Sequence, residues 1–137
     1  MATLTAGQRR AQAKYEYDAF LDSCPSRQLI EVIGNKWVCL VLAAVRNGPR
    51  RHSEILREIA GVSQKMLTQT LRELERDGLI TRTVTPTVPV RVDYELTELG
   101  ADLQGVMRTV KAWAEDHMAE VLANRERFEV SGQSVAR

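Results

Sequence analysis

Hydrophobic residues recur at intervals of three and four positions through most of the chain, and this spacing predicts helices. A helix of moderate strength is expected over residues 8–22, and a longer one from about 26 to 46. A short helix over about 53–60 and another over 63–77 follow, and a last helix runs from 97 to about 122. The chain is therefore expected to be mainly helical.

Residues that start or stop helices separate these segments. Ser53 and Ser63 are the expected N-caps, because a serine hydroxyl accepts a backbone N–H at the start of a helix. Gly61 ends the short helix and Gly78 ends the one after it. The run Asn47-Gly48-Pro49 stops the long helix before them. Two helices are thus joined by a short turn that contains Gly61, which is typical of a helix-turn-helix.

The period changes to two between residues 90 and 96, where apolar and charged side chains alternate. Alternation predicts a strand with one buried face, and residues 79–85 make a less regular partner strand. Pro86 and Pro89 lie between the two strands, and they belong in a turn because proline cannot donate to a strand ladder. The order of elements predicts a winged helix-turn-helix with an extra helix at each end. The fold class is mainly α with a small β-hairpin.

No segment resembles a linker, so residues 1–137 are expected to form one domain with its core at about 24–97. The last helix carries a broad apolar stripe that a chain of this size has too little core to cover. The last helix, 97–122, is therefore expected to bury this stripe against a partner, the alternative being that it packs only against the first helix, 8–22, of its own chain. The first six residues and the tail 131–137 lack apolar periodicity and are expected to be frayed. The stripe consists of Leu99, Leu103, Val106, Val110 and Trp113, flanked by Met107, Ala114, Met118, Val121 and Leu122.

The helix over 63–77 has a face suited to DNA. No carboxylate occurs in the sequence between Glu58 and Glu73. A surface that enters a DNA groove needs this, because an acidic side chain there would meet the negatively charged phosphates. Glutamine can bind adenine, lysine and arginine can bind guanine, and threonine can contact the thymine methyl group. The alternative is an ordinary amphipathic helix with a polar outer face. The candidate DNA-binding residues on this helix are Ser63, Gln64, Lys65, Thr68, Gln69 and Arg72.

Two arginines flank the tip of the predicted hairpin. Arg82 and Arg91 are placed to reach phosphates or a minor groove, where arginine is favoured electrostatically. Arg82 has the alternative of pairing across the strands with Asp93 or Glu95. Arg91 is therefore the preferred candidate for DNA, and Arg82 is left open.

The sequence resembles a known family over roughly residues 20–122. The stretches IGNKW (33–37), GVSQKMLTQTLRELERDGLITR (61–82) and VPVRVDYELTELG (88–100), with the pair Cys24-Pro25, are similar to the HxlR-type winged helix-turn-helix regulators, MarR-like transcriptional regulators of bacteria. Asn35 stands where the family usually has glycine, and His52 where a phenylalanine is common. The resemblance implies a homodimer held largely by its terminal helices, with recognition helices in successive major grooves and the wings nearby. Two-fold symmetry of this kind predicts an inverted-repeat operator in double-stranded DNA, occupied more naturally by a repressor than by an activator.

Cys24 is the candidate redox sensor. A helix N-terminus and the nearby Arg27 both lower a thiol pKa and favour the reactive thiolate. Regulators of the resembled family sense oxidants or electrophiles at the matching position, which implies an intersubunit disulfide or an adduct at Cys24. The alternative is a small side chain that fills space beside the dimer helices. Cys39 lies within the long apolar helix and is expected to pack in the core.

Composition and motifs narrow the function further. Hydrophobic residues make up 44% and charged residues 27% of the chain, as in a globular protein, and the longest apolar run is too short to span a bilayer. The N-terminus has no signal-peptide pattern, and two cysteines are too few for a framework of disulfide bonds. A cytoplasmic protein with reduced thiols is therefore expected. Only His52 and His117 supply imidazoles, without a metal-binding or phosphate-loop motif, so no enzyme, metal or cofactor is expected. The remaining alternatives are a regulator controlled by a small molecule at the dimer interface and a protein-interaction module without DNA binding.

Overall fold

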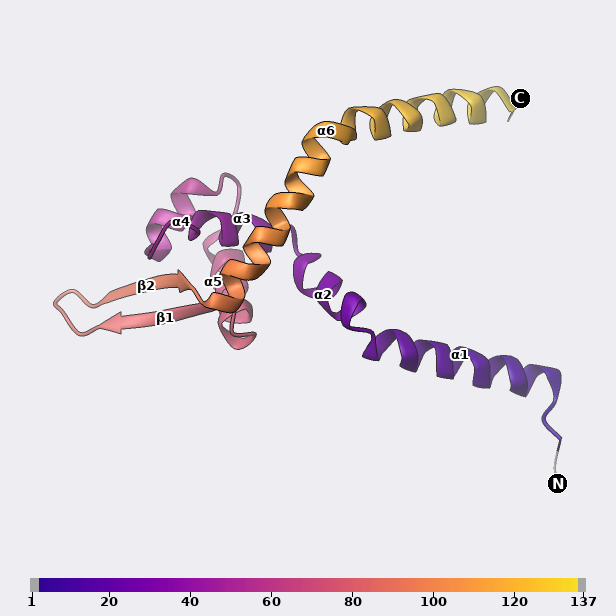
Figure 1. Cartoon of the computed structure of the whole chain (residues 1–137), viewed down its shortest axis with the longest axis horizontal. Coiled ribbons are helices and arrows are strands. Elements are labelled where there is room, and N and C mark those ends of the chain that lie inside the picture. Colours follow the sequence, from indigo (N-terminus) through magenta and orange to yellow (C-terminus); the bar gives the residue numbers. More distant parts are fainter. Residues whose placement is uncertain (1–2, 136–137) are drawn as a thin grey trace.

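The computed structural model describes residues 3–135 of the chain. Within these residues, six helices and one antiparallel hairpin follow the predicted order, except that two helices stand where the sequence predicted one long helix (Figure 1). Their bounds are α1 Ala6–Ser23, α2 Pro25–Ile33, α3 Lys36–Ala44, α4 His52–Glu58, α5 Gln64–Arg76, β1 Ile80–Thr85, β2 Arg91–Leu96 and α6 Glu98–Val135. The predicted fold class, mainly helical with a winged helix-turn-helix, is confirmed.

The core is aliphatic and lies among α3, α4, α5, the start of β1 and the first part of α6. Helix α5 buries Leu67, Thr70, Leu71 and Leu74, which the helical period places on one face. Met107 is the contribution of α6 to the same cluster. The remaining buried apolar residues are Val38, Val41, Leu42, Ala44, Val45, Ile55, Ile59, Val62, Leu79 and Ile80.

The long helix expected over 26–46 is in fact two helices, α2 and α3, which separate at Gly34 and Asn35. Asn35 has an extended backbone, and its Oδ1 accepts the backbone N–H of Trp37 at 2.9 Å. Its amide nitrogen also lies 3.5 Å from the hydroxyl of Thr70 on α5. A short polar side chain that caps a new helix therefore overrides the continuous apolar periodicity.

Helix α4 also starts differently from the prediction. Arg51, not Ser53, precedes the first turn, and the Glu54 carboxylate accepts both the backbone N–H and the Nε–H of Arg51 at 3.2 Å. Ser53 instead lies inside the helix. The carboxylate near the helix N-terminus is also favoured by the helix dipole.

The hairpin is a two-stranded antiparallel sheet that pairs Ile80 with Leu96 and Thr85 with Arg91. Its base is fixed to the helices, because Arg50 and Tyr94 exchange two backbone hydrogen bonds of 2.9 and 2.8 Å. The expectation of a strand with one buried face is only partly right. Tyr94 and Leu96 are half-buried near the base, whereas Val90 precedes the first residue of β2 and is 62% exposed.

The start of α6 lies directly against the turn between α5 and β1. Thr97 donates its hydroxyl to the carbonyl of Gly78 at 2.7 Å, and its backbone N–H to the carbonyl of Leu79 at 3.1 Å. The same hydroxyl accepts the backbone N–H of Gly100 at 3.0 Å, so Thr97 caps α6 at the position where the sequence predicted the last helix to begin. These contacts fix the direction in which α6 leaves the core.

Helix α1 and the second half of α6 extend away from the core as two diverging arms (Figure 1). Helix α6 continues to Val135, so it is longer than expected, and residues 131–135 are helical where a frayed tail was expected. At the other end, Ala6 already belongs to α1. Residues 1–2 and 136–137, which were also expected to be frayed, lie outside the described residues.

Within residues 3–135, no helix combines the length and the apolar character needed to cross a membrane. In the same part of the chain, no group of three or more His, Cys, Asp or Glu side chains is arranged to hold a metal ion.

Candidate nucleic-acid interface

Helix α5 turns one polar face to solvent and buries the opposite face in the core. The hydroxyl of Ser63 accepts the backbone N–H of Met66 at 3.1 Å, which confirms the predicted N-cap. Gly61, in the turn before it, has a φ of +89°, a conformation that glycine adopts without strain. The polar side chains of α5 line one shallow surface depression: Gln64, Lys65, Thr68, Gln69 and Arg72. The structure therefore brings together five of the six residues that the sequence proposed on this helix, and the sixth, Ser63, is the N-cap and does not line the depression.

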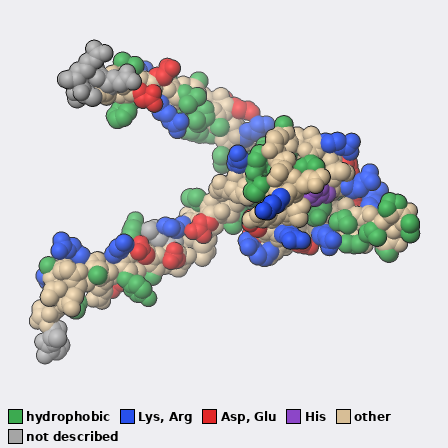
Figure 2. Space-filling view, turned by 180° about the vertical axis from the view of Figure 1, so that it is seen from behind, with side chains coloured by type: hydrophobic (Ala, Val, Ile, Leu, Met, Phe, Trp, Pro, Cys, Tyr) green, Lys and Arg blue, Asp and Glu red, His purple; other side chains and the backbone are tan. Residues whose placement is uncertain are grey.

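The charge of this surface is positive. Lys65 and Arg72 are exposed, and neither forms an ion pair within residues 3–135. Glu73 lies at the edge of the surface, half-buried, and accepts a hydrogen bond of 3.3 Å from the side-chain amide of Gln69. This bond holds one amide N–H of Gln69 and leaves its second N–H and its carbonyl oxygen for other partners. Figure 2 shows lysine and arginine side chains gathered around the globular part of the molecule.

One contact to this surface comes from a residue that the sequence did not assign to DNA. His52 is the first residue of α4, and its Nε2 lies 3.1 Å from the hydroxyl oxygen of Thr68. Both side chains are half-buried. The unusual histidine at this position was visible in the sequence, but the partner sixteen residues away was not.

In the wing, the two arginines have different surroundings. Arg91 forms an ion pair with Asp93 two residues further along β2, with Nε–oxygen distances of 3.0 and 3.3 Å. The hydrogen bond to Asp93 and its negative charge raise the pKa of Arg91 above the usual range. Arg82 is exposed, faces Tyr94 in the ladder, and forms no ion pair within the described part of the chain. Asp93 thus binds Arg91, the preferred candidate, rather than Arg82 as the alternative had it.

Cys24 is half-buried at the N-cap of α2. The backbone N–H groups of Arg27 and Ser26 at the start of α2 lower the pKa of the Cys24 thiol below its ordinary value. The positive charge of Arg27 acts in the same direction. These are the two causes that the sequence indicated, with the helix N-terminus the larger of them. Cys39 is half-buried on α3 and packs against the core, in line with its expected structural role.

Helices α1 and α6 expose large apolar side chains. Along α6, Leu99, Val106, Val110 and Trp113 are each more than half exposed, and we call these four residues the α6 stripe. Met107 from the broader predicted stripe is buried in the core, and Leu103 packs against the core partly buried. On α1, three aromatic side chains are exposed: Tyr15 (75%), Tyr17 (61%) and Phe20 (64%). The α6 stripe lies in the first half of α6, and α1 of the same chain runs away from that part of the helix and does not cover it (Figure 1).

Comparison with known proteins agrees with this geometry. The family model for HxlR-like helix-turn-helix proteins matches residues 32–122. The HTH-type transcriptional regulator YtfH of Escherichia coli is 40% identical over 116 residues, which are 85% of this chain and 92% of YtfH. The redox regulator HypR in its reduced form has a TM-score of 0.69 at 35% identity and covers 73% of this chain and 99% of HypR. Diamide-treated YodB of Bacillus subtilis has a TM-score of 0.60 at 39% identity, with 69% of this chain and 94% of YodB covered.

The family model covers the helix-turn-helix, the wing and α6 as far as Leu122. The matches also confirm that the chain is not an enzyme, because the family and the relatives are transcriptional regulators. The chain belongs to the HxlR-like helix-turn-helix family of transcriptional regulators.

Proposed function

We propose that this transcriptional regulator is a homodimeric repressor that binds an inverted-repeat operator in double-stranded DNA. The observation that carries the proposal is the surface of α5, where five polar or basic side chains line one depression without a carboxylate among them. A recognition helix of this kind enters the major groove and contacts base edges with its exposed side chains. Repression follows when the operator overlaps a promoter.

Each side chain on α5 has a role suited to its chemistry. Gln69 and Gln64 read base edges, because a side-chain amide can donate and accept at once, as adenine requires. Lys65 and Arg72 bind phosphates or guanine, and Thr68 contacts a base edge or a thymine methyl group. Ser63 lies at the helix N-terminus, where backbone N–H groups favour a phosphate. In the wing, Arg91 reaches DNA by exchanging Asp93 for a phosphate.

The exposed α6 stripe supports the homodimer. The α6 stripe presents large apolar side chains to solvent along a helix with no cover from its own chain. Contiguous exposed apolar surface of this kind marks an interface in a folded protein. A two-fold axis through paired α6 helices places two α5 helices on one face of the DNA, about 34 Å apart.

The test is operator selection from random DNA followed by fluorescence anisotropy at two salt concentrations. We expect an inverted repeat to be enriched, and the protein to bind it more tightly than a scrambled duplex of the same composition. Binding to both duplexes should weaken as salt rises, because phosphate contacts release counterions. Failure to enrich any sequence would contradict the proposal and favour a protein-interaction role for this winged helix.

Replacing Lys65 with alanine is expected to weaken binding to all duplexes. Its ammonium is exposed and free of ion pairs within residues 3–135, so it acts on phosphates without reading sequence. The slope of log affinity against log salt should fall by about 1. Lys111 on α6 is the matched control, because it is exposed and forms an ion pair with Glu115 away from α5. An unchanged salt slope in Lys65→Ala would exclude the phosphate role.

Oxidation of Cys24 is the proposed signal that releases the operator. Two Cys24 thiols, one from each protomer, would form a disulfide with loss of two protons and two electrons, which diamide takes up as it is reduced at its N=N bond. The lowered pKa of Cys24 supports this proposal, because the thiolate is the reactive form. The similarity to the redox regulator HypR and to YodB, known in a diamide-treated form, supports it further.

The pH dependence of alkylation tests the thiol directly. In a Cys39→Ser background, the rate of reaction of Cys24 with iodoacetamide should rise with pH and level off at a lower pH than for free cysteine, whose pKa is about 8.5. The direction follows from the sign of the shift, since a lowered pKa means that the thiolate forms at lower pH. A midpoint at or above that of free cysteine would contradict the activated thiol. In the anisotropy assay, diamide should release DNA from Cys39→Ser but not from the Cys24→Ser, Cys39→Ser double variant.

A further inference from the structure

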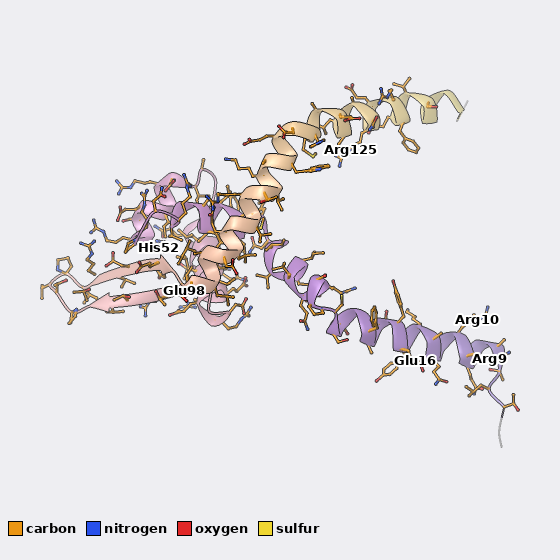
Figure 3. All side chains as sticks on the ribbon, viewed as in Figure 1. Arg9, Arg10, Glu16, His52, Glu98 and Arg125 are labelled. Atoms are coloured by element: carbon orange, nitrogen blue, oxygen red, sulfur yellow. The ribbon has the colours of Figure 1, made fainter. Side chains whose placement is uncertain are left out.

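His52 is placed to control the chemistry of the recognition surface from outside it. It begins α4, on the side of the molecule from which the hairpin extends (Figure 3). Its Nε2 lies 3.1 Å from the hydroxyl oxygen of Thr68 on α5, which makes it a side-chain hydrogen bond between the two helices of the helix-turn-helix. The contact is half-buried, so water competes with it less than with an exposed pair.

Thr68 contacts His52 and also lines the depression on the surface of α5. One side of its hydroxyl meets His52, and the side chain also lines the surface depression that Gln64, Lys65, Gln69 and Arg72 share. A threonine hydroxyl has one proton to donate and two lone pairs that accept. If the hydroxyl accepts a hydrogen bond from His52, its proton is free to donate to a ligand in the depression. If it donates to His52, only its lone pairs are left for the ligand.

We propose that His52 is a specificity-determining positioning residue, whose Nε2–H donates to Thr68 and so directs the Thr68 proton outward to an acceptor on DNA. The inference rests on the proposed DNA-binding role of α5 and names a base preference for that site. The acceptors that the hydroxyl then matches are purine N7, guanine O6 and thymine O4 in the major groove. His52 itself does not contact the DNA.

The direction of the hydrogen bond between His52 and Thr68 is inferred from the donors and acceptors that DNA presents in its major groove. If Thr68 donated to His52, its hydroxyl would offer only lone pairs, which match the two amino groups of adenine and cytosine. Acceptors outnumber donors on major-groove edges, and every phosphate oxygen is an acceptor. The chain from Nε2–H through the hydroxyl to DNA is also mutually polarising, which strengthens each bond in it.

The experiment measures base preference in four variants: His52→Phe, His52→Gln, Thr68→Val and the His52→Phe, Thr68→Val double variant. Each binds the selected operator and a panel of operators changed at single base pairs, by fluorescence anisotropy. His52→Phe should lower the preference at one base pair of each half-site by about 3- to 10-fold, the effect of one hydrogen bond. His52→Gln should keep most of the preference, because its side-chain amide also donates. In the Thr68→Val background, His52→Phe should have no further effect at that base pair.

The outcomes separate this inference from the proposed function. If the wild-type protein binds the operator and His52→Phe leaves the base preference unchanged, the inference is wrong and the proposed function stands. The same holds if His52→Phe has an equal effect with and without the Thr68 hydroxyl, since His52 would then act through packing alone. If the wild-type protein selects no DNA, both are overturned. Thermal unfolding of each variant checks the fold, and should His52→Phe not fold, the comparison of His52→Gln with Thr68→Val still decides, since equal losses would contradict the relay.

Discussion

Replacing Gly100 with alanine is expected to destabilise the protein by about 3 kcal/mol or more, at the upper end of the effects of overpacking. Gly100 is buried in the first turns of α6, where the helix lies against the turn between α5 and β1. A Cβ atom added there would lie 1.8 Å from the carbonyl oxygen of Leu79 and 2.8 Å from its carbonyl carbon. Both atoms belong to the backbone, so a rotamer change cannot relieve the clash. Helix α6 must move away from the core.

Gly105 supplies the matched control. It lies one and a half turns further along α6, and an added Cβ would meet only the end of the flexible Arg108 side chain, at 3.7 Å. Gly105→Ala should therefore stabilise the protein by up to about 1 kcal/mol through helix propensity. Urea unfolding followed by circular dichroism measures both variants. Equal midpoints for Gly100→Ala and the wild-type protein would show that the close approach of α6 to Leu79 is not required.

Replacing Val110 with aspartate is expected to dissociate the dimer. Val110 is in the middle of the α6 stripe and 51% exposed in the single chain, so the proposed dimer would cover it. The substitution brings two carboxylates, one from each protomer, into an apolar interface, and removing an unpaired charge from water costs several kcal/mol. The dimer dissociation constant should rise at least about 100-fold. Operator affinity should fall by a similar factor, because each protomer then binds its half-site alone.

Ala112→Asp is the control for this prediction. Ala112 is exposed on α6 only two residues away, which places it on the opposite side of the helix from Val110. The variant adds the same charge without entering the stripe, so it should remain dimeric. Analytical ultracentrifugation at micromolar concentration distinguishes the two. A dimeric Val110→Asp variant would place the interface elsewhere and remove the role assigned to the α6 stripe.

Most of the fold could be predicted because its signals are local. The turn at Gly61, the cap at Ser63 and the alternation in β2 each depend on residues close together in sequence. The division of the long helix at Asn35 was missed because an apolar period continues through it and only a side-chain cap interrupts the backbone. The last part of α6 was missed for the opposite reason. Residues 123–135 lack an apolar stripe, yet they include helix-favouring alanine, arginine and glutamate.

The candidate site was predicted where one helix supplies it and missed where two elements meet. The period of α5 was enough to group Lys65 with Arg72, because both lie on the same face of one helix. The contact of His52 with Thr68 depends on how α4 packs across α5, which no local pattern records. The ion pair of Arg91 with Asp93 could have been predicted from the sequence, because alternate residues of a strand lie on the same face.

The unbroken course of α6 makes it a mechanical lever. Its 38 residues form one continuous helix that bends between the part on the core and the arm (Figure 1), and its length along the helix axis is about 57 Å at about 1.5 Å per residue. A tilt of about 5° at one end of the helix displaces its other end by up to about 5 Å, which is comparable to the rise of about 3.4 Å between base pairs. Small rotations between the two arms of a dimer are therefore enough to take the α5 helices out of register with the operator. A signal need not reach the DNA-binding surface to switch it off, because changing the angle at which two levers cross is sufficient.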